Sequence, residues 1–444
     1  MGYTRRRGRR PNEYASKSAH GHVINDPAVQ DFLAHCSLPK RAEEVDLSKS
    51  TSTSFEPVSE NPIQHVIAVD GGYNEVAVRK EFPSATICFF QFGALVFSVA
   101  DLEELDDQPF IDPDDIAKLK RIQRLKLMLP VRNVALKTAG TLTQSVRKAV
   151  YDFFCRSMDD GKLIESLRWF LFEEYADGVA AWTMASCPAC GSRSIPLQRS
   201  AIARDHTFAC PECNGNIYLT DVFRFHEVVD DELGAGEILG YLTTTIEQMI
   251  LVHLIRTILR TKPALMESVL FIKDGPLAFF GQTANMHQPM RALVKFLFER
   301  HELYMAGLEK SGPFVEHADE IAGLLEDGSV LILDDDYIYR YILPGKGRPA
   351  NPYGSSTYYS NKLIFKTTSG AMYVVTVPTT ESNPHPTESD LRDLRAILTN
   401  IEKLRCDMYD NSLIPVTLVN KLVSLANHPS TRILQKFAVD TLGH

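Results

Sequence analysis

The segment HVIAVDGGYNEVAV, residues 65–78, decides the fold class because it predicts the first strands of a sheet. The residues before Asp70 are apolar and mostly β-branched, which indicates a buried strand, and the glycines after it predict a turn into a second strand. The next run, SATICFFQFGALVFSVA (84–100), predicts a long strand in which Gly93 marks a bulge or bend. Together the two segments predict an antiparallel meander.

Beyond the meander, predicted helices and strands alternate without an extended βαβ repeat. Residues 48–59 are predicted to be a linker, and 29–36 a short helix. Apolar residues at helical spacing predict helices from the acidic segment 101–115 to about residue 177, and a long helix over about 236–261. Further strands are predicted within 267–279, 302–312, 330–343, 357–366 and 371–378, and further helices over 286–300 and from about 386 onward. The sum is a mixed α/β domain with a helical insertion.

Composition places the chain among ordinary globular proteins. Its 444 residues allow two or three domains, with 44% hydrophobic and 23% charged residues. No stretch of about 18 apolar residues predicts a membrane span, and the N-terminal arginines lack the apolar region of a secretory signal. Eight cysteines, four of them in the spacing of a metal site, indicate a reducing, cytoplasmic location. The four isolated cysteines are expected to be ordinary buried thiols. They are Cys36, Cys88, Cys155 and Cys406.

The charge distribution argues against a protein that coats nucleic acid non-specifically. The net charge is −9, yet residues 1–22 contain six basic residues and one acid, Glu13. We expect residues 1–60 to form a basic disordered arm and linker. Two interpretations of the arm remain open: local contact with phosphates, or a solvated tail without a partner.

Four cysteines have the spacing of a metal site. Cys187 and Cys190 lie in CPAC, Cys210 and Cys213 lie in CPEC, and nineteen residues separate the pairs. Two such turns can close a tetrahedron of thiolates around Zn²⁺, and the intervening segment is long enough for a small hairpin. Such a site would be structural, because four sulfurs leave no position for water. The alternatives are a disulfide pair, a chance pattern, or a rubredoxin-like iron site.

The candidates for chemistry are carboxylates that follow apolar strands. Asp70 and Asp274 each end such a strand and each precede a glycine, which lets a metal or a phosphate approach closely. A single Asp-Gly is more often only a turn. Glu247 lies on the long apolar helix, where it needs a partner, which could be a metal ion or else Arg256 or Arg260. Lys310, after a later strand, could neutralise phosphate charge or be an ordinary surface lysine.

Several common catalytic motifs are absent from the sequence. It contains no G-x-x-x-x-G-K-[ST], no G-x-G-x-x-G and no G-x-S-x-G. These absences argue against a P-loop ATPase, a dinucleotide enzyme and an α/β-hydrolase.

Five segments, in this order, resemble the NurA nuclease family over roughly residues 60–440. They are DGGYN (70–74), IYLTDVFRFHEVVDDELGAGEILGYL (217–242) with Glu247 after it, KDGPL (273–277), GLEKSG (307–312) and IPVTLVNKLVSLA (414–426). The cysteine pattern before IYLTD is similar to that of a bacterial subset. The resemblance predicts a NurA-like domain over 61–444 with a zinc-ribbon insertion at 180–220.

The resemblance implies an RNase H-like core that cuts DNA with manganese or magnesium. Asp70, Glu247 and Asp274 would be the metal ligands, with two ions flanking the scissile phosphate. It further implies a ring-like homodimer around DNA and a HerA-type hexameric ATPase partner, in DNA end processing or anti-phage defence. One position departs from the family pattern, because Asn420 stands where a histidine is expected. Asn420 therefore keeps open the alternative of a catalytically degraded DNA clamp. A second alternative is an adaptor in which the zinc ribbon and the basic arm bind a partner protein.

Overall fold

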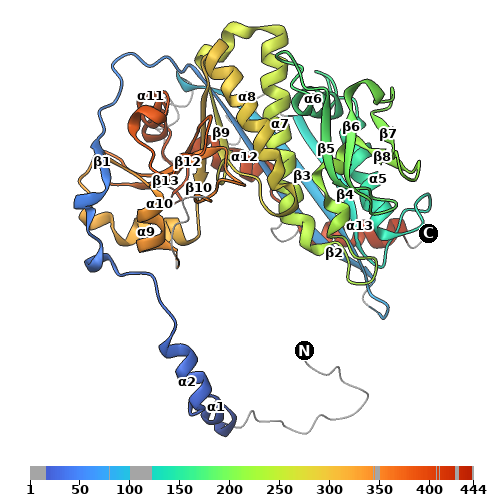
Figure 1. Cartoon of the computed structure of the whole chain (residues 1–444), viewed down its shortest axis with the longest axis horizontal. Helices are drawn as coiled ribbons and strands as arrows, with labels where there is room; N and C mark the ends of the chain where they lie inside the picture. Colours follow the sequence, from blue (N-terminus) through green and yellow to red (C-terminus); the bar gives the residue numbers. More distant parts are fainter. Residues whose placement is uncertain are drawn as a thin grey trace.

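The structure is a computed structural model that describes residues 17–79, 81–100, 123–343, 345, 351–406, 408, 409, 411–425 and 430–442. Within these residues the chain forms a nine-stranded mixed sheet (Figure 1). The strand order across the sheet is β1-β11-β12-β13-β10-β9-β2-β3-β4. The strands are β1 (Thr51–Ser54), β2 (His65–Arg79), β3 (Ala85–Ser98), β4 (Gln123–Arg132), β9 (Val269–Asp274), β10 (Tyr304–Glu309), β11 (Ser329–Ile332), β12 (Ser360–Lys366) and β13 (Met372–Pro378).

The centre of the sheet has the strand order of an RNase H-like core. Strands β2, β3 and β4 form an antiparallel meander, while β9 pairs parallel to β2 and β10 pairs parallel to β9. The β9–β10 connection runs through helix α8, as parallel neighbours require. The predicted α/β fold class is confirmed, and the parallel pairing brings the ends of β9 and β10 to one edge beside the middle of β2.

Helices cover both faces of this sheet (Figure 1). One face packs in a common apolar cluster with four helices, and the opposite face packs with two others. A smaller cluster joins α9 to strands β11–β13, and α13 packs beside β2. The four helices on the first face are α5 (Leu142–Cys155), α6 (Leu163–Leu171), α7 (Leu239–Thr261) and α8 (His287–Arg300). The two helices on the opposite face are α11 (Leu394–Lys403) and α12 (Ile414–Val423). Helix α9 spans Pro313–Glu320 and helix α13 spans Ser430–Leu442.

Helix α7 is the central core helix. The stretch Gly236–Thr261 is long and apolar enough to cross a membrane by length and composition, but 78% of its most apolar window is buried inside the protein. Apolar residues on most of its sides contact the sheet and the neighbouring helices. Its hydropathy therefore reflects its place in the core.

The meander differs from its prediction at the glycines. The predicted turn at DGGYN does not exist, because β2 runs for 15 residues without interruption and pairs with β3 throughout. The predicted bulge at Gly93 is also absent. A Cβ at Gly71 would lie 2.6 Å from the Phe92 ring, and one at Gly93 would lie 2.9 Å from Val423. Both glycines thus serve close packing rather than a change of chain direction.

Three further predictions were wrong. Helices were expected from the acidic segment 101–115 to about residue 177, but residues 123–132 form β4. The leucines at every second position, Leu125, Leu127 and Leu129, are the strand signal that was overlooked. Part of the expected linker, Thr51–Ser54, is the edge strand β1. The strand predicted over 330–343 ends at Ile332, where Asp334 caps the N-terminus of a short helix by accepting a hydrogen bond from the Tyr337 amide.

The N-terminal arm lies partly outside the described residues, since the description begins at residue 17. Helix α1 (Lys17–Ile24) and helix α2 (Pro27–Ala34) follow, and the second of these agrees with the helix predicted at 29–36. Figure 1 shows both helices apart from the body of the protein. The acidic segment 101–115 also lies outside the described residues.

Candidate functional site

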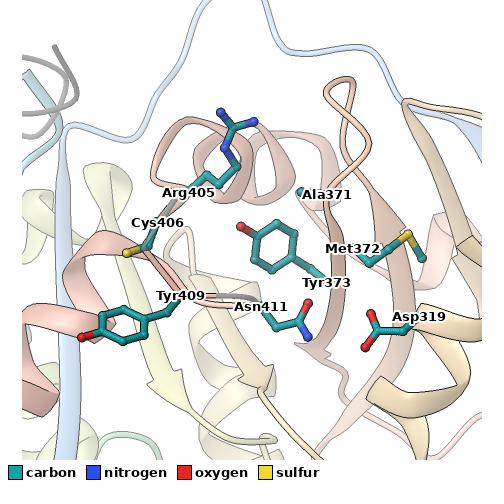
Figure 2. Close-up of a pocket in the computed structure, with 8 residues that line it drawn as sticks. All are labelled: Asp319, Ala371, Met372, Tyr373, Arg405, Cys406, Tyr409 and Asn411. Carbon is teal, nitrogen blue, oxygen red and sulfur yellow. The ribbon is translucent and has the colours of Figure 1, made fainter. Parts of the chain in front are cut away.

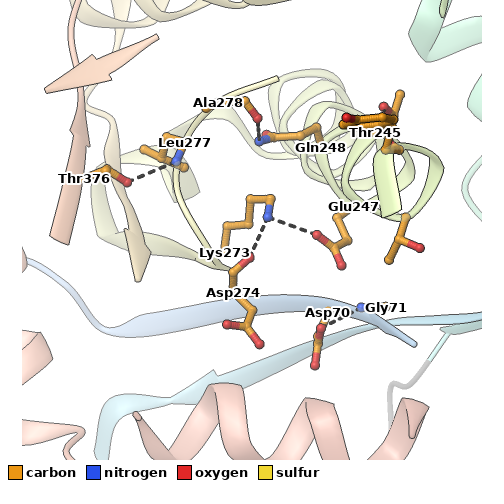
Figure 3. Close-up of polar contacts among 12 residues, drawn as sticks. Asp70, Gly71, Thr245, Glu247, Gln248, Lys273, Asp274, Leu277, Ala278 and Thr376 are labelled. Atoms are coloured by element: carbon orange, nitrogen blue, oxygen red, sulfur yellow. Dashed lines mark hydrogen bonds and ion pairs between the residues drawn. The ribbon is translucent and has the colours of Figure 1, made fainter. Parts of the chain in front are cut away.

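Sheet register brings two predicted aspartates together. Val69 on β2 is the partner of Lys273 on β9, so the next residues, Asp70 and Asp274, are neighbours on adjacent parallel strands. Side chains alternate between the faces of a sheet, which directs both aspartates to the face covered by α12 (Figure 3). The two Asp-Gly pairs that lie 204 positions apart in the sequence therefore form one local acidic site.

Asp70 is buried, and only one of its two carboxylate oxygens is hydrogen-bonded. Its side chain is 4% exposed, its Oδ1 accepts a hydrogen bond from the Gly71 amide at 2.8 Å, and its Oδ2 has no hydrogen-bond partner. Burial, together with the charges of Asp274 and Glu247, raises the pKa of Asp70 to about 7. A buried carboxylate oxygen without a donor is a position that a cation would satisfy.

Glu247 approaches from the opposite face of the sheet, on α7. It is 5% exposed, and its carboxylate lies 3.0 Å from the ammonium group of Lys273 (Figure 3). The expectation of an ion pair with Arg256 or Arg260 was wrong for Arg256, which instead contacts Glu165 and Ser166 on α6. Burial raises the pKa of Glu247, and the charge and hydrogen bond of Lys273 oppose that rise.

Lys310, which the sequence offered either as a phosphate-neutralising group or as a surface lysine, contacts the acidic cluster. Its ammonium group is 2.7 Å from Oδ2 of Asp274, and the two side chains are 28% and 20% exposed. This pair is the part of the cluster that solvent reaches, because Asp70 and Glu247 are both buried. All four predicted residues are therefore brought into one region.

Sequence reasoning missed Lys273, which is 2% exposed. Its ammonium group also donates to the main-chain carbonyl of Asp274 at 2.5 Å. The sequence did contain a signal for it: Lys273 lies in the apolar strand VLFIKD, at a position that shares a face with the buried Phe271. A buried lysine at such a position needs a carboxylate partner.

The acidic cluster contains the kind of donor atoms that bind a divalent cation. Three carboxylates provide the hard oxygen ligands that manganese and magnesium prefer, and Oδ2 of Asp70 is free to bind one. The three carboxylates do not converge on a single point, however. In the part of the chain that the structure describes, only the four cysteines bring all their ligand atoms within 4.8 Å of one another. Lysines 273 and 310 stand beside two of the carboxylates instead.

The four cysteines form a compact cluster with metal-site geometry. The Sγ atoms of Cys187 and Cys213 are 3.9 Å apart, and those of Cys190 and Cys210 are 4.0 Å apart. A tetrahedral site with metal–sulfur bonds of about 2.3 Å has sulfurs separated by about 3.8 Å. Backbone amides point at two of the sulfurs, from Ala189 to Cys187 and from Gly215 to Cys213. Such amides stabilise thiolates, so the cluster fits a closed metal site.

Two small hairpins carry these cysteines, β5–β6 and β7–β8. The insertion is fixed to the core by Arg147 of α5, whose guanidinium makes two bonds to the carboxylate of Asp221, at 2.9 and 2.7 Å. The same guanidinium donates to the main-chain carbonyl of Asn216. The strands are β5 (Ala181–Ser186), β6 (Arg193–Gln198), β7 (Thr207–Ala209) and β8 (Asn216–Tyr218).

Other features lie away from the acidic cluster. Asn420 is exposed on α12. A pocket of about 360 Å³ lies beside the start of β13, and its lining includes Tyr373, Arg405 and Asn411 (Figure 2). A larger pocket of about 790 Å³ lies between α7 and the first residues of β2. None of the predicted catalytic residues lines either pocket.

No protein-family model matches the chain, and no curated protein matches it. Among solved structures, the chain is similar to the crystal structure of the NurA nuclease from Sulfolobus solfataricus, with 8% identity, a TM-score of 0.37 and coverage of 96% of this chain and 97% of that chain. A crystal structure of NurA with manganese has 11% identity, a TM-score of 0.29 and coverage of 88% and 92%. With identity and scores this low, the function of this chain must be argued from its own residues.

Proposed function

We propose that the chain is a manganese- or magnesium-dependent DNA nuclease. The observation that carries the proposal is the meeting of Asp70 and Asp274 on adjacent parallel strands, with a buried, unpartnered oxygen on Asp70 and with Lys310 beside Asp274. The sequence motifs shared with NurA nucleases point to the same residues. This arrangement supports hydrolysis of a phosphodiester better than any other common chemistry, because it offers hard oxygen ligands next to an accessible ammonium group.

The proposed role of each residue follows from its exposure to solvent and from its position relative to the two aspartates. Asp70 and Asp274 would hold the cation, which when bound activates water and neutralises phosphate charge. Lys310 is exposed enough to turn from Asp274 towards a phosphate oxygen. Glu247 lies behind the strands and would complete the acidic environment from α7.

We further propose zinc in the Cys187, Cys190, Cys210 and Cys213 cluster, as a structural ion. A HerA-type hexameric ATPase would supply the motor, because the sequence has no P-loop of its own. A homodimer around DNA, a role in DNA end processing or anti-phage defence, and residence in the cytoplasm complete the proposal. These parts depend on the motif resemblance and on the cysteine pattern of the sequence.

The test compares digestion of linear DNA by the wild type, Asp70→Ala and Asp274→Ala. The reactions contain manganese and the HerA-type partner. Each substitution removes a ligand that no neighbouring carboxylate on the same face replaces, so activity should fall by about a hundredfold or more while folding is retained. Glu165→Gln is the matched control, because Glu165 is a carboxylate that contacts Arg256 instead of this cluster. It should digest DNA like the wild type.

Two outcomes would contradict the proposal. Wild-type digestion by both aspartate variants would remove the acidic cluster from the reaction. A wild type that binds DNA without cutting it under any divalent metal would favour the non-catalytic clamp.

A further inference from the structure

Lys273 is a fixed cation inside the acidic cluster. Its ammonium group lies 3.0 Å from the carboxylate of Glu247 and donates to the main-chain carbonyl of Asp274. Both members of the ion pair are buried, at 2% and 5% exposure. A charge buried to this degree is stable only with its partner in place, so the pair should persist under any condition that keeps the protein folded.

The two lysines of the cluster differ in their freedom. The Lys310 side chain is 28% exposed and can leave Asp274 for solvent or for a ligand. Lys273 projects from the middle of the sheet into the core between β9 and α7, so its ammonium group has no route to water without disrupting packing. A divalent cation arriving from solvent can therefore displace Lys310 from Asp274 but cannot displace Lys273 from Glu247.

The sheet also separates the carboxylates. Asp70 and Asp274 project to the α12 face, while Glu247 and Lys273 meet on the α7 face (Figure 3). Oδ2 of Asp70 has no partner, whereas the Glu247 carboxylate already has a positive one. The only ligand position open to a cation in this cluster of described residues thus lies at the aspartate pair.

We propose that the ammonium group of Lys273 takes the place of a second divalent cation, so that this site binds one catalytic metal ion. The inference depends on the proposed nuclease function for its catalytic meaning. Lys273 is a positioning residue: it compensates the charge of Glu247 and holds the main chain of Asp274, which places the Asp274 carboxylate beside Asp70. The metal ion binds at Asp70 and Asp274 and leaves Glu247 to its lysine.

The first experiment counts manganese ions by titration calorimetry and by electron paramagnetic resonance on the full chain with its cysteine-bound metal retained. The wild type should bind one Mn²⁺ per chain, Asp274→Ala should bind none, and Glu247→Gln should still bind one. Lys273→Met and the double variant Glu247→Gln with Lys273→Met should also bind one, because neither substitution opens a route from solvent to the buried position 247. Two ions on the wild type, with one lost in Glu247→Gln, would overturn the proposal.

The second experiment measures thermal unfolding without added divalent metal. Lys273→Met leaves Glu247 buried and uncompensated, so the midpoint should fall by about 5–10 °C. The double variant should regain most of that loss, because it removes both charges from the core. Additive losses in the double variant would show that Lys273 is not the counter-charge of Glu247. This comparison of single and double variants tests the role of Lys273 independently of metal binding. If the wild type bound no Mn²⁺, that result would refute the proposed nuclease function and not the pairing of Lys273 with Glu247.

Discussion

The two candidate metal sites of this protein are built in opposite ways. In the cysteine cluster, two turns of four residues each supply two ligands, and 26 positions separate the first ligand from the last. In the acidic cluster, each carboxylate comes from a different element, β2, α7 or β9, and Asp70 is 204 positions from Asp274. The first cluster needs only local turns, whereas the second needs the finished sheet.

The two clusters also differ in which groups compensate their negative charge. The cysteine sulfurs converge on one point and receive backbone amides, as a permanently bound ion requires. The carboxylates are held apart, and two lysines stand beside them. Under the proposed function, the acidic cluster would be stable without a metal and could exchange one during a reaction cycle, while the cysteine cluster would depend on its ion. Four predictions test this contrast, from the largest effect to the smallest.

A chelator should remove the metal from the acidic cluster and leave the metal in the cysteine cluster. Brief treatment with EDTA should lower DNA digestion by about a thousandfold or more, since the charge stabilisation that a catalytic metal supplies is worth several kcal/mol. Excess manganese should restore it. The cysteine-bound metal should remain, as elemental analysis of the treated protein would show. If both metals left together, or if digestion survived the treatment, the contrast would be wrong.

Loss of one thiolate should damage the fold rather than the chemistry alone. Cys210→Ser should release about one metal ion per chain and lower the free energy of unfolding by about 4 kcal/mol or more, because the buried Phe208 and Ile217 of the insertion belong to the main apolar cluster. Urea unfolding and elemental analysis measure both effects. Cys36→Ser, at an exposed cysteine outside the insertion, is the control and should change neither. A variant that kept its metal would refute the assignment.

The acidic cluster should make metal-free stability depend on pH. The pKa of Asp70 is raised from 3.8 to about 7 in the folded protein, so ionisation of Asp70 disfavours folding. The stability that this group contributes is complete below pH 4 and is lost as the pH rises through about 7, by about 4 kcal/mol at most. The free energy of unfolding of the wild type, measured relative to Asp70→Asn without divalent metal, should therefore decrease between pH 5 and 8. A difference that stayed constant over that range would contradict the assigned environment of Asp70.

The smallest effect concerns the strand that carries Asp70. Gly71→Ala would place a Cβ 2.6 Å from the buried ring of Phe92, so the strand or the ring must shift, at a cost of about 1–3 kcal/mol in the free energy of unfolding. Manganese affinity should fall with it, because the neighbouring carboxylate moves. Gly140→Ala is the control, since nothing lies within 4 Å of a Cβ there. Equal stability of the two variants in urea would show that β2 tolerates the change.

Much of the fold was accessible from the sequence because its signals are local. The apolar runs that form β2, β3, β9, β12 and β13 have the composition of strands, and the apolar stretch that forms α7 is too long for a single strand. The errors arose where a local signal had two meanings. Gly71, Gly72 and Gly93 are typical of turns and bulges. Here Gly71 makes room for Phe92 on the neighbouring strand β3, and Gly72 and Gly93 make room for Val423 at the end of α12, which no local pattern reveals.

The sequence by itself determined the cysteine cluster, because each Cys-x-x-Cys turn places two thiols close together and only nineteen residues separate the two turns. It also named Asp70, Asp274, Glu247 and Lys310 as candidates. Only the tertiary structure decided that the two aspartates share one face, that Lys273 pairs with Glu247 on the other, and that Lys310 lies beside Asp274. The physical reason is sheet register: a shift of one residue between β2 and β9 would exchange the faces of every side chain, and register is set by packing across the whole core.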